Sequence, residues 1–164
     1  IFTSTVSVGG EVMTRAVMQE LSLSAEEAEA FKDNKGLLVD RADKRAEKAP
    51  GIEALSSAAS ALADEVVRHY HYWDTRRDEH GERMTPIARV FLVGGTSNLR
   101  GLADYIAARV QAPTVRPDIW QNVCSFDEYI PPIDRPTSLQ FATAVGLALR
   151  GLPARAGGTV RAGM

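Results

Sequence analysis

Residues 90–102 read VFLVGGTSNLRGL, in which four apolar residues run into two adjacent glycines and a polar turn leads into apolar residues at helical spacing. A short apolar run before Gly-Gly predicts a buried strand that ends at Val93, followed by a helix over 98–110. Because glycine has no Cβ, Gly94 and Gly95 suit either a tight turn or the close approach of a ligand to the backbone. A strand that leads directly into a helix favours an α/β fold.

A second junction of the same kind opens the chain. Apolar residues over 2–8 alternate with Ser and Thr before Gly9 and Gly10, and apolar residues at helical spacing follow over 11–21. This pattern predicts a strand, a glycine turn and a helix. The sequence enters this strand directly and without a Met, so we expect the chain to be part of a larger protein.

The same spacing rules predict further elements. Ser24 stands three residues before Glu27, which is a capping-box pattern for a helix that ends at Gly36. The other predicted elements are a charged loop over 36–49, a long helix from Pro50 to about Trp73, a short strand in PTVRP at 113–117 and a last helix over 138–149. Their order predicts an α/β protein with helices inserted after the first strand.

Charge and cysteine content argue against several functions. The chain has 19 basic and 21 acidic residues, a net charge of −2, so neither nucleic acid nor a charged membrane surface is an expected partner. It has no run of 18 apolar residues, so no membrane-spanning segment is expected. Cys124 is the single cysteine, which favours a reducing compartment. Without a neighbouring His or a CxxC pattern it is expected to be a small buried or half-buried residue and not a nucleophile.

Neither of two aromatic stretches indicates a catalytic or metal site. In HYHYW, His69 and His71 stand two residues apart on a helix and point to different faces, so a polar-aromatic helix surface is favoured over a metal site. The stretch WQNVCSFDEYIPPI at 120–133 is either a loop packed on the fold or a partner surface rich in hot-spot residues. No catalytic residue and no metal ligand is predicted.

The residues alone allow two roles for the second glycine pair. In the first, Gly94 and Gly95 make a tight connection between strand and helix, and Ser97 or Asn98 caps that helix. In the second, backbone N–H groups at the end of a strand hold a flat or anionic ligand, as in open α/β sheets.

Glu29 and Lys32 also allow two interpretations. They stand three residues apart in AEAFK, so they share one face of the predicted second helix. A carboxylate at this place accepts hydrogen bonds from ribose hydroxyls, and an ammonium lies near a ring or a phosphate. The alternative is a solvated ion pair of little energetic weight.

Four pieces of sequence, in this order and at this spacing, resemble the second half of an actin-like ATPase: SVGGEVMT (7–14), AEAFK (28–32), VFLVGGTSNLRGLADYIAARV (90–110) and FATAVGLALRG (141–151). Within that superfamily the chain is most similar to PilM, the type IV pilus assembly family that is related to the division protein FtsA. The resemblance implies an α/β, ribonuclease H-like fold: the second subdomain of an actin-like ATPase with an inserted helical lobe. It divides the chain into a sheet lobe of residues 1–10 plus 84–151, a helical lobe of residues 11–83 and a disordered tail, 152–164.

The resemblance also implies that the glycine pair faces the adenosine of ATP. In the superfamily the strand-glycine loop packs on the adenine near the α-phosphate, and the position matched by Asn98 holds a residue that stands against the base. The AExxK helix meets the ribose and base from across the cleft, and the first glycine pair serves the helix that covers the site. The implied cofactor-binding residues are Gly94, Gly95, Thr96, Asn98, Glu29, Lys32, Gly9 and Gly10.

The patterns that hold the outer phosphates are missing from this chain. Actin-like ATPases bind the β- and γ-phosphates and Mg²⁺ between two glycine-rich hairpins with DxG-type patterns, and no DxG occurs here. The resemblance therefore implies that the Mg²⁺ ligands belong to an N-terminal half and that this chain alone is inactive. Whether the whole protein hydrolyses ATP stays open.

For function, the resemblance implies a nucleotide-binding scaffold of type IV pilus assembly. Such a protein is cytoplasmic and peripheral at the inner membrane through partners such as PilN, which docks mainly on the other half of the fold, and it is able to self-associate. The alternative is an FtsA-like filament scaffold of cell division. FtsA-like chains end in an amphipathic helix, and the tail LPARAGGTVRAGM lacks that pattern, which favours PilM. A more remote alternative is a sugar-kinase-like phosphotransferase, which needs a catalytic Asp in a DxG-type loop, and this chain has no DxG.

Overall fold

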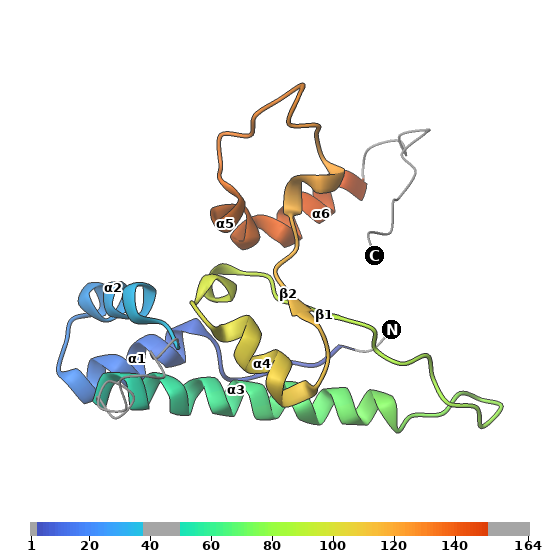
Figure 1. The fold of residues 1–164 in the computed structure, drawn as a ribbon, viewed down its shortest axis with the longest axis horizontal. Helices are drawn as coiled ribbons and strands as arrows, with labels where there is room; N and C mark the ends of the chain where they lie inside the picture. Colours follow the sequence, from blue (N-terminus) through green and yellow to red (C-terminus); the bar gives the residue numbers. More distant parts are fainter. Residues whose placement is uncertain (1–2, 38–49, 151–164) are drawn as a thin grey trace. The chain divides into compact units, whose positions relative to one another are not determined.

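A computed structural model describes residues 3–37 and 50–150 of the 164-residue chain. The chain divides into two compact units, Ile1–Pro117 and Asp118–Met164 (Figure 1). Most of the expected loop over 36–49 and the whole expected tail, 152–164, lie outside the described residues. The division into a sheet lobe and a helical lobe stays a prediction.

Three helices open the first unit: α1 (Gly10–Leu21), α2 (Ala25–Lys35) and α3 (Pro50–Asp74). Their bounds confirm the helices predicted from apolar spacing. The predicted capping box is also present, because the Ser24 N–H donates to Glu27 Oε2 at 2.9 Å and the Ser24 hydroxyl accepts from the Glu27 N–H at 3.3 Å. Gly36 ends α2 with a φ of +62°, a conformation that favours glycine.

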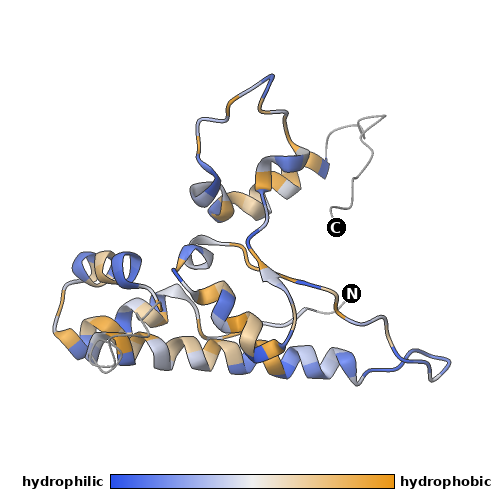
Figure 2. Cartoon of the chain, viewed as in Figure 1, coloured by the Kyte–Doolittle hydropathy of each residue, from blue (hydrophilic) through white to orange (hydrophobic). Residues whose placement is uncertain are grey.

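The core of this unit forms where α1 and α4 (Leu102–Val110) pack on α3. Figure 1 shows how these helices are arranged, and Figure 2 marks the hydrophobic residues along them in orange. Met13, Leu55 and Ile106, one from each helix, are at most 1% exposed. Full burial of a side chain of this size contributes about 1.5–3 kcal/mol relative to its exposed state.

A two-stranded parallel sheet lies beside these helices. Strand β1 (Val90–Phe91) pairs with β2 (Thr114–Val115), and the register places Val90 opposite Thr114. The connection from β1 to β2 runs through a 3₁₀ turn, η1 (Gly95–Asn98), and α4. In the described residues the fold is therefore helix-rich α/β, with a short parallel sheet and a crossover helix.

Three expectations about β1 and this connection were wrong. The helix predicted over 98–110 is split into η1 and α4, because Leu99 adopts an extended conformation and Gly101 a left-handed one, with φ values of −55° and +84°. The residue that precedes α4 as its N-cap is Gly101, and neither Ser97 nor Asn98 has this role. The strand predicted to end at Val93 is shortened to Val90–Phe91, and it is not fully buried as predicted, since Phe91 is 57% exposed.

The strand predicted over 2–8 is not formed in its described part, residues 3–8. A strand requires a neighbour for its backbone N–H and C=O groups, and the described sheet contains β1 and β2 alone. Alternation of apolar and polar residues is therefore not sufficient to form a strand over 3–8. Val6 and Val8 are half-buried without strand pairing.

The second unit contains η2 (Ile119–Asn122), α5 (Arg135–Ser138), η3 (Leu139–Phe141) and α6 (Ala142–Arg150). The single helix predicted over 138–149 is thus divided at η3. The Trp120 indole N–H donates to the Ile133 carbonyl at 3.2 Å and closes the aromatic loop at its base, whereas Ile130 within the loop is 80% exposed. The loop is therefore packed at its base and exposed at Ile130, which is compatible with a packed loop and with a partner surface.

Among the residues that the structure describes, none of the helices has the length and apolar content needed to cross a membrane.

Candidate functional site

The two glycine pairs line one cavity of the first unit, with a volume of about 660 Å³. Its floor comes from α3 and α4 through Leu62, Val66, Leu102 and Ile106. One wall is the segment that leads into α1, and the other is the chain from β1 into η1. The polar and glycine residues that line it, called its rim below, are Ser4, Gly9, Gly10, Gly94, Gly95, Thr96 and Ser97.

The second glycine pair makes a turn that requires glycine. Gly94 has φ +91° and ψ 167°, which a residue with a side chain rarely adopts. Its carbonyl accepts from the Ser97 hydroxyl at 2.6 Å and from the Ser97 N–H at 3.1 Å. A Cβ built on Gly94 meets no atom within 4 Å, so the turn also leaves open space beside its backbone. Both features considered for the glycine pair, a tight turn and open space beside the backbone, therefore occur at Gly94.

The first glycine pair brings α1 against that turn. Gly9 precedes α1 with an extended backbone and no side-chain cap, and its carbonyl accepts from the Val12 and Met13 N–H groups at 3.1 and 3.2 Å. Gly9 and Gly10 both line the cavity, so α1 begins at it. A Cβ on Gly10 would overlap the Thr96 hydroxyl. Glycine at position 10 therefore serves a close approach between two segments that lie 86 positions apart in the sequence.

Glu29 and Lys32 are joined by an ion pair, which Thr14 of α1 completes. Lys32 Nζ donates to Glu29 Oε1 at 2.6 Å and to the Thr14 hydroxyl at 3.1 Å. The Thr14 hydroxyl lies 2.5 Å from Glu29 Oε2 and 3.0 Å from the Gly10 carbonyl, and it donates to one of these at a time. Lys32 is 4% exposed, so the solvated pair considered from the sequence is wrong for Lys32.

The electrostatics of this cluster favour the charged carboxylate. Partial burial raises the pKa of Glu29, but the hydrogen bonds from Lys32 and Thr14 and the charge of Lys32 outweigh it and hold that pKa below its ordinary value. A buried ammonium needs such compensation, because an unpaired charge in the interior is costly. Glu29 is consequently an acceptor with one exposed side, and Lys32 is enclosed.

Five of the eight sequence-predicted residues meet at the cavity, namely Gly9, Gly10, Gly94, Gly95 and Thr96. The other three, Glu29, Lys32 and Asn98, are not among the residues that line it. Glu29 and Lys32 are nevertheless one hydrogen-bonded step away, through Thr14 and the Gly10 carbonyl. Thr14 belongs to the piece SVGGEVMT, four residues after the glycine pair, but it is not among the residues predicted to bind.

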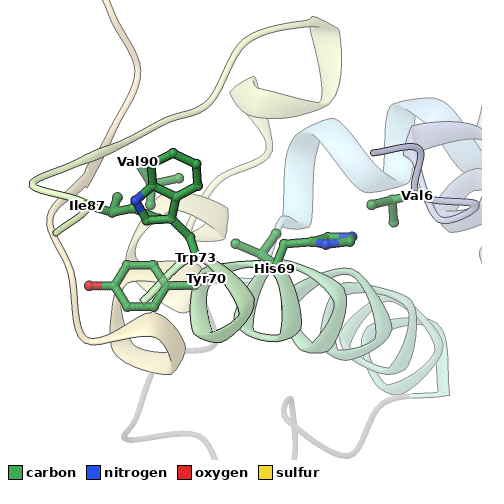
Figure 3. A pocket seen from close by; sticks show the side chains of 7 residues that line it. Val6, His69, Tyr70, Trp73, Ile87 and Val90 are labelled. Carbon is green, nitrogen blue, oxygen red and sulfur yellow. The ribbon is translucent and has the colours of Figure 1, made fainter. Parts of the chain in front are cut away.

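A second, more apolar pocket of about 450 Å³ shares Val6 and Val66 with the cavity (Figure 3). Trp73 and Tyr70 of α3 lie on one side of it with Ile87 and Val90 nearby, and His69 extends toward Val6. In the described ranges there is no group of three or more residues that could hold a metal ion. His69 and His71 do not combine into such a site.

Comparison with known families decides what kind of protein carries this cavity. The family model of the type IV pilus assembly protein PilM matches residues 1–152. The chain belongs to the PilM family. Comparison with curated proteins finds no match.

The match to the PilM family covers the whole first unit and continues through α6. All eight predicted binding residues lie within it. Involvement in type IV pilus assembly therefore follows from family membership.

Proposed function

We propose that this chain is the nucleotide-binding part of an actin-like PilM scaffold, in which the glycine-lined cavity receives the adenosine of ATP. The observation that carries the proposal is that Gly9, Gly10, Gly94 and Gly95 line one cavity although they come from distant parts of the chain. Backbone without side chains allows a planar ring to lie against it, and the apolar floor suits a base.

The polar groups at the rim suit a nucleotide. Because Gly9 and Gly10 line the cavity, α1 begins at it, and the N-terminal end of a helix favours a negatively charged group. Thr96 adds a hydroxyl beside the second glycine pair. In this proposal the exposed side of the Glu29 carboxylate accepts hydrogen bonds from ribose hydroxyls, which its link through Thr14 to Gly10 supports.

The cavity fits an adenosine better than a metal ion. The described residues that line it include no carboxylate, whereas Mg²⁺ is bound by oxygen ligands, commonly Asp or Glu together with phosphate. The proposal therefore places the Mg²⁺ ligands in another part of the native protein. When Mg²⁺-ATP is bound, the metal neutralises phosphate charge, and this chain holds and orients the nucleoside.

At the level of the cell, we propose a cytoplasmic scaffold beneath the inner-membrane platform of the pilus, with PilN or a similar pilus protein as its partner. Family membership supports pilus partners in general. Nucleotide binding would order the cavity and change the surface offered to those partners.

Titration calorimetry with ATP, with and without Mg²⁺, tests the nucleotide. The full-length native protein is expected to bind ATP, and Gly95→Asp, which places a carboxylate at the rim of the cavity, is expected to abolish binding. The matched control is Gly146→Asp, because a side chain at Gly146 of α6 meets nothing within 4 Å. If the folded native protein binds no ATP, or Gly95→Asp binds as well as the wild type, the glycine pair serves the turn alone.

A further inference from the structure

The Thr14 side chain lies where three groups from two helices converge. It contacts the Gly10 carbonyl in its own helix and both members of the Glu29–Lys32 pair in α2, at 2.5–3.1 Å. A threonine hydroxyl has one proton to donate and accepts as well, so it satisfies the Lys32 ammonium and one oxygen acceptor together. Valine has nearly the same shape and provides neither interaction.

Lys32 is enclosed by this arrangement. The Lys32 side chain is 6% exposed, against 51% for the Glu29 side chain. Lys32 Nζ has two hydrogen-bond partners within the cluster, and the residue does not line the cavity. In this cluster Glu29 is the group with a free side, and Lys32 and Thr14 fix where that side lies.

Thr14 also reaches the cavity through the backbone. Gly10 lines the rim, and its close contact with Thr96 connects α1 to the turn after β1. A hydroxyl that contacts both the Gly10 carbonyl and Glu29 Oε2 couples the position of the carboxylate to the first turn of α1.

We propose that Thr14 is a positioning residue for nucleotide binding: its hydroxyl holds the Glu29 carboxylate and the start of α1 in the geometry that receives the nucleoside, and Lys32 supports Glu29 from the buried side. The inference rests on the proposed function. It assigns no contact between Thr14 or Lys32 and the ligand.

Titration of the full-length native protein with an ATP analogue that carries a fluorescent group tests this role. Thr14→Val is expected to weaken binding roughly tenfold, a loss typical of residues that orient a binding group. Thr14→Ser, which keeps the hydroxyl, is expected to bind within about twofold of the wild type, since the retained hydroxyl preserves the orienting hydrogen bonds. Circular dichroism and urea unfolding verify that each variant is folded. If Thr14→Val does not fold, Thr14→Ala gives the same comparison.

A double mutant separates positioning from a general loss of structure. If Thr14 acts through Glu29, then Thr14→Val should weaken binding much less in a Glu29→Ala background, which removes the accepting carboxylate, than in the wild type. Equal effects in both backgrounds, a Thr14→Ser variant as weak as Thr14→Val, or unchanged binding by Thr14→Val would overturn the inference while the proposed function stands. A wild type that binds no nucleotide would overturn both.

Discussion

Gly10 shows how a single missing side chain decides the distance between two segments. The first turn of α1 lies directly against Thr96, and any Cβ at position 10 would overlap the Thr96 hydroxyl. Gly94 has a different requirement, because its positive φ demands glycine while the space around it is open. Two glycines that look alike in the sequence thus serve a close approach and a turn, respectively.

Replacement of Gly10 by Ala is expected to destabilise the protein by about 1–3 kcal/mol, the usual cost of an added methyl in a packed contact. A second substitution, Thr96→Ala, removes the overlapping hydroxyl and leaves a Cβ at 3.4 Å, an ordinary contact distance, so the double mutant should regain most of the loss. Urea unfolding of the two single mutants and the double mutant measures this coupling. Additive effects would show that the two segments do not touch in solution.

At the scale of elements, α2 is held at its C-terminal end by two contacts. In its last turn Lys32 bonds to Thr14 of α1, and just past its end the Leu37 N–H donates to the Arg100 carbonyl at 2.7 Å. Gly36 lies in close contact with Arg100, where a Cβ would be 2.6 Å from the Arg100 Cβ and 2.7 Å from its carbonyl oxygen. The C-terminal end of α2 therefore packs against the turn before α4.

Gly36→Ala is expected to cost roughly 2–4 kcal/mol, because a left-handed alanine is strained and its methyl meets backbone atoms that have little freedom to move. Gly81→Ala is the matched control: Gly81 also has a positive φ, +79°, but nothing lies within 4 Å of its Cβ position. It should cost only the conformational part, roughly 1–2 kcal/mol. Equal midpoints for the two variants in urea would contradict the contact with Arg100.

The junction of α1 and α2 should also give the stability a pH dependence. The pKa of Glu29 lies below its ordinary value of 4.5 in the folded state, so the stabilisation by its charge is complete at neutral pH and is lost as the pH falls through the folded-state pKa. The wild type should therefore be more stable than Glu29→Gln at pH 7, with a difference that shrinks as the pH is lowered toward 3. Urea midpoints across this range measure it, and a constant difference would argue against the ion pair.

At the scale of the whole molecule, the chain has two compact units with different amounts of core. The first unit contains the buried cluster of α1, α3 and α4, whereas Leu139 is the sole hydrophobic side chain in the described part of the second unit that is both large and fully enclosed. The cavity and the Thr14 cluster both lie within the first unit.

The segment 1–117 is accordingly expected to fold without the rest of the chain. Trp73 is its single tryptophan, since the other, Trp120, belongs to the second unit, so intrinsic fluorescence reports on this unit alone. A truncated chain should show a cooperative urea transition by fluorescence and by circular dichroism, with coincident midpoints. A gradual, non-cooperative transition would show that residues 118–164 are needed for the core.

The sequence by itself determined the three long helices, the capping box at Ser24 and the places of the two short strands, because apolar periodicity and capping are local properties. It also named the two glycine junctions and the Glu29–Lys32 pair. Only the tertiary structure decided that the segment over 3–8 forms no strand, because strand formation depends on a partner elsewhere in the chain. It likewise decided that both glycine pairs share one cavity and that Lys32 is buried against Thr14, because such contacts depend on how α1 and α2 pack.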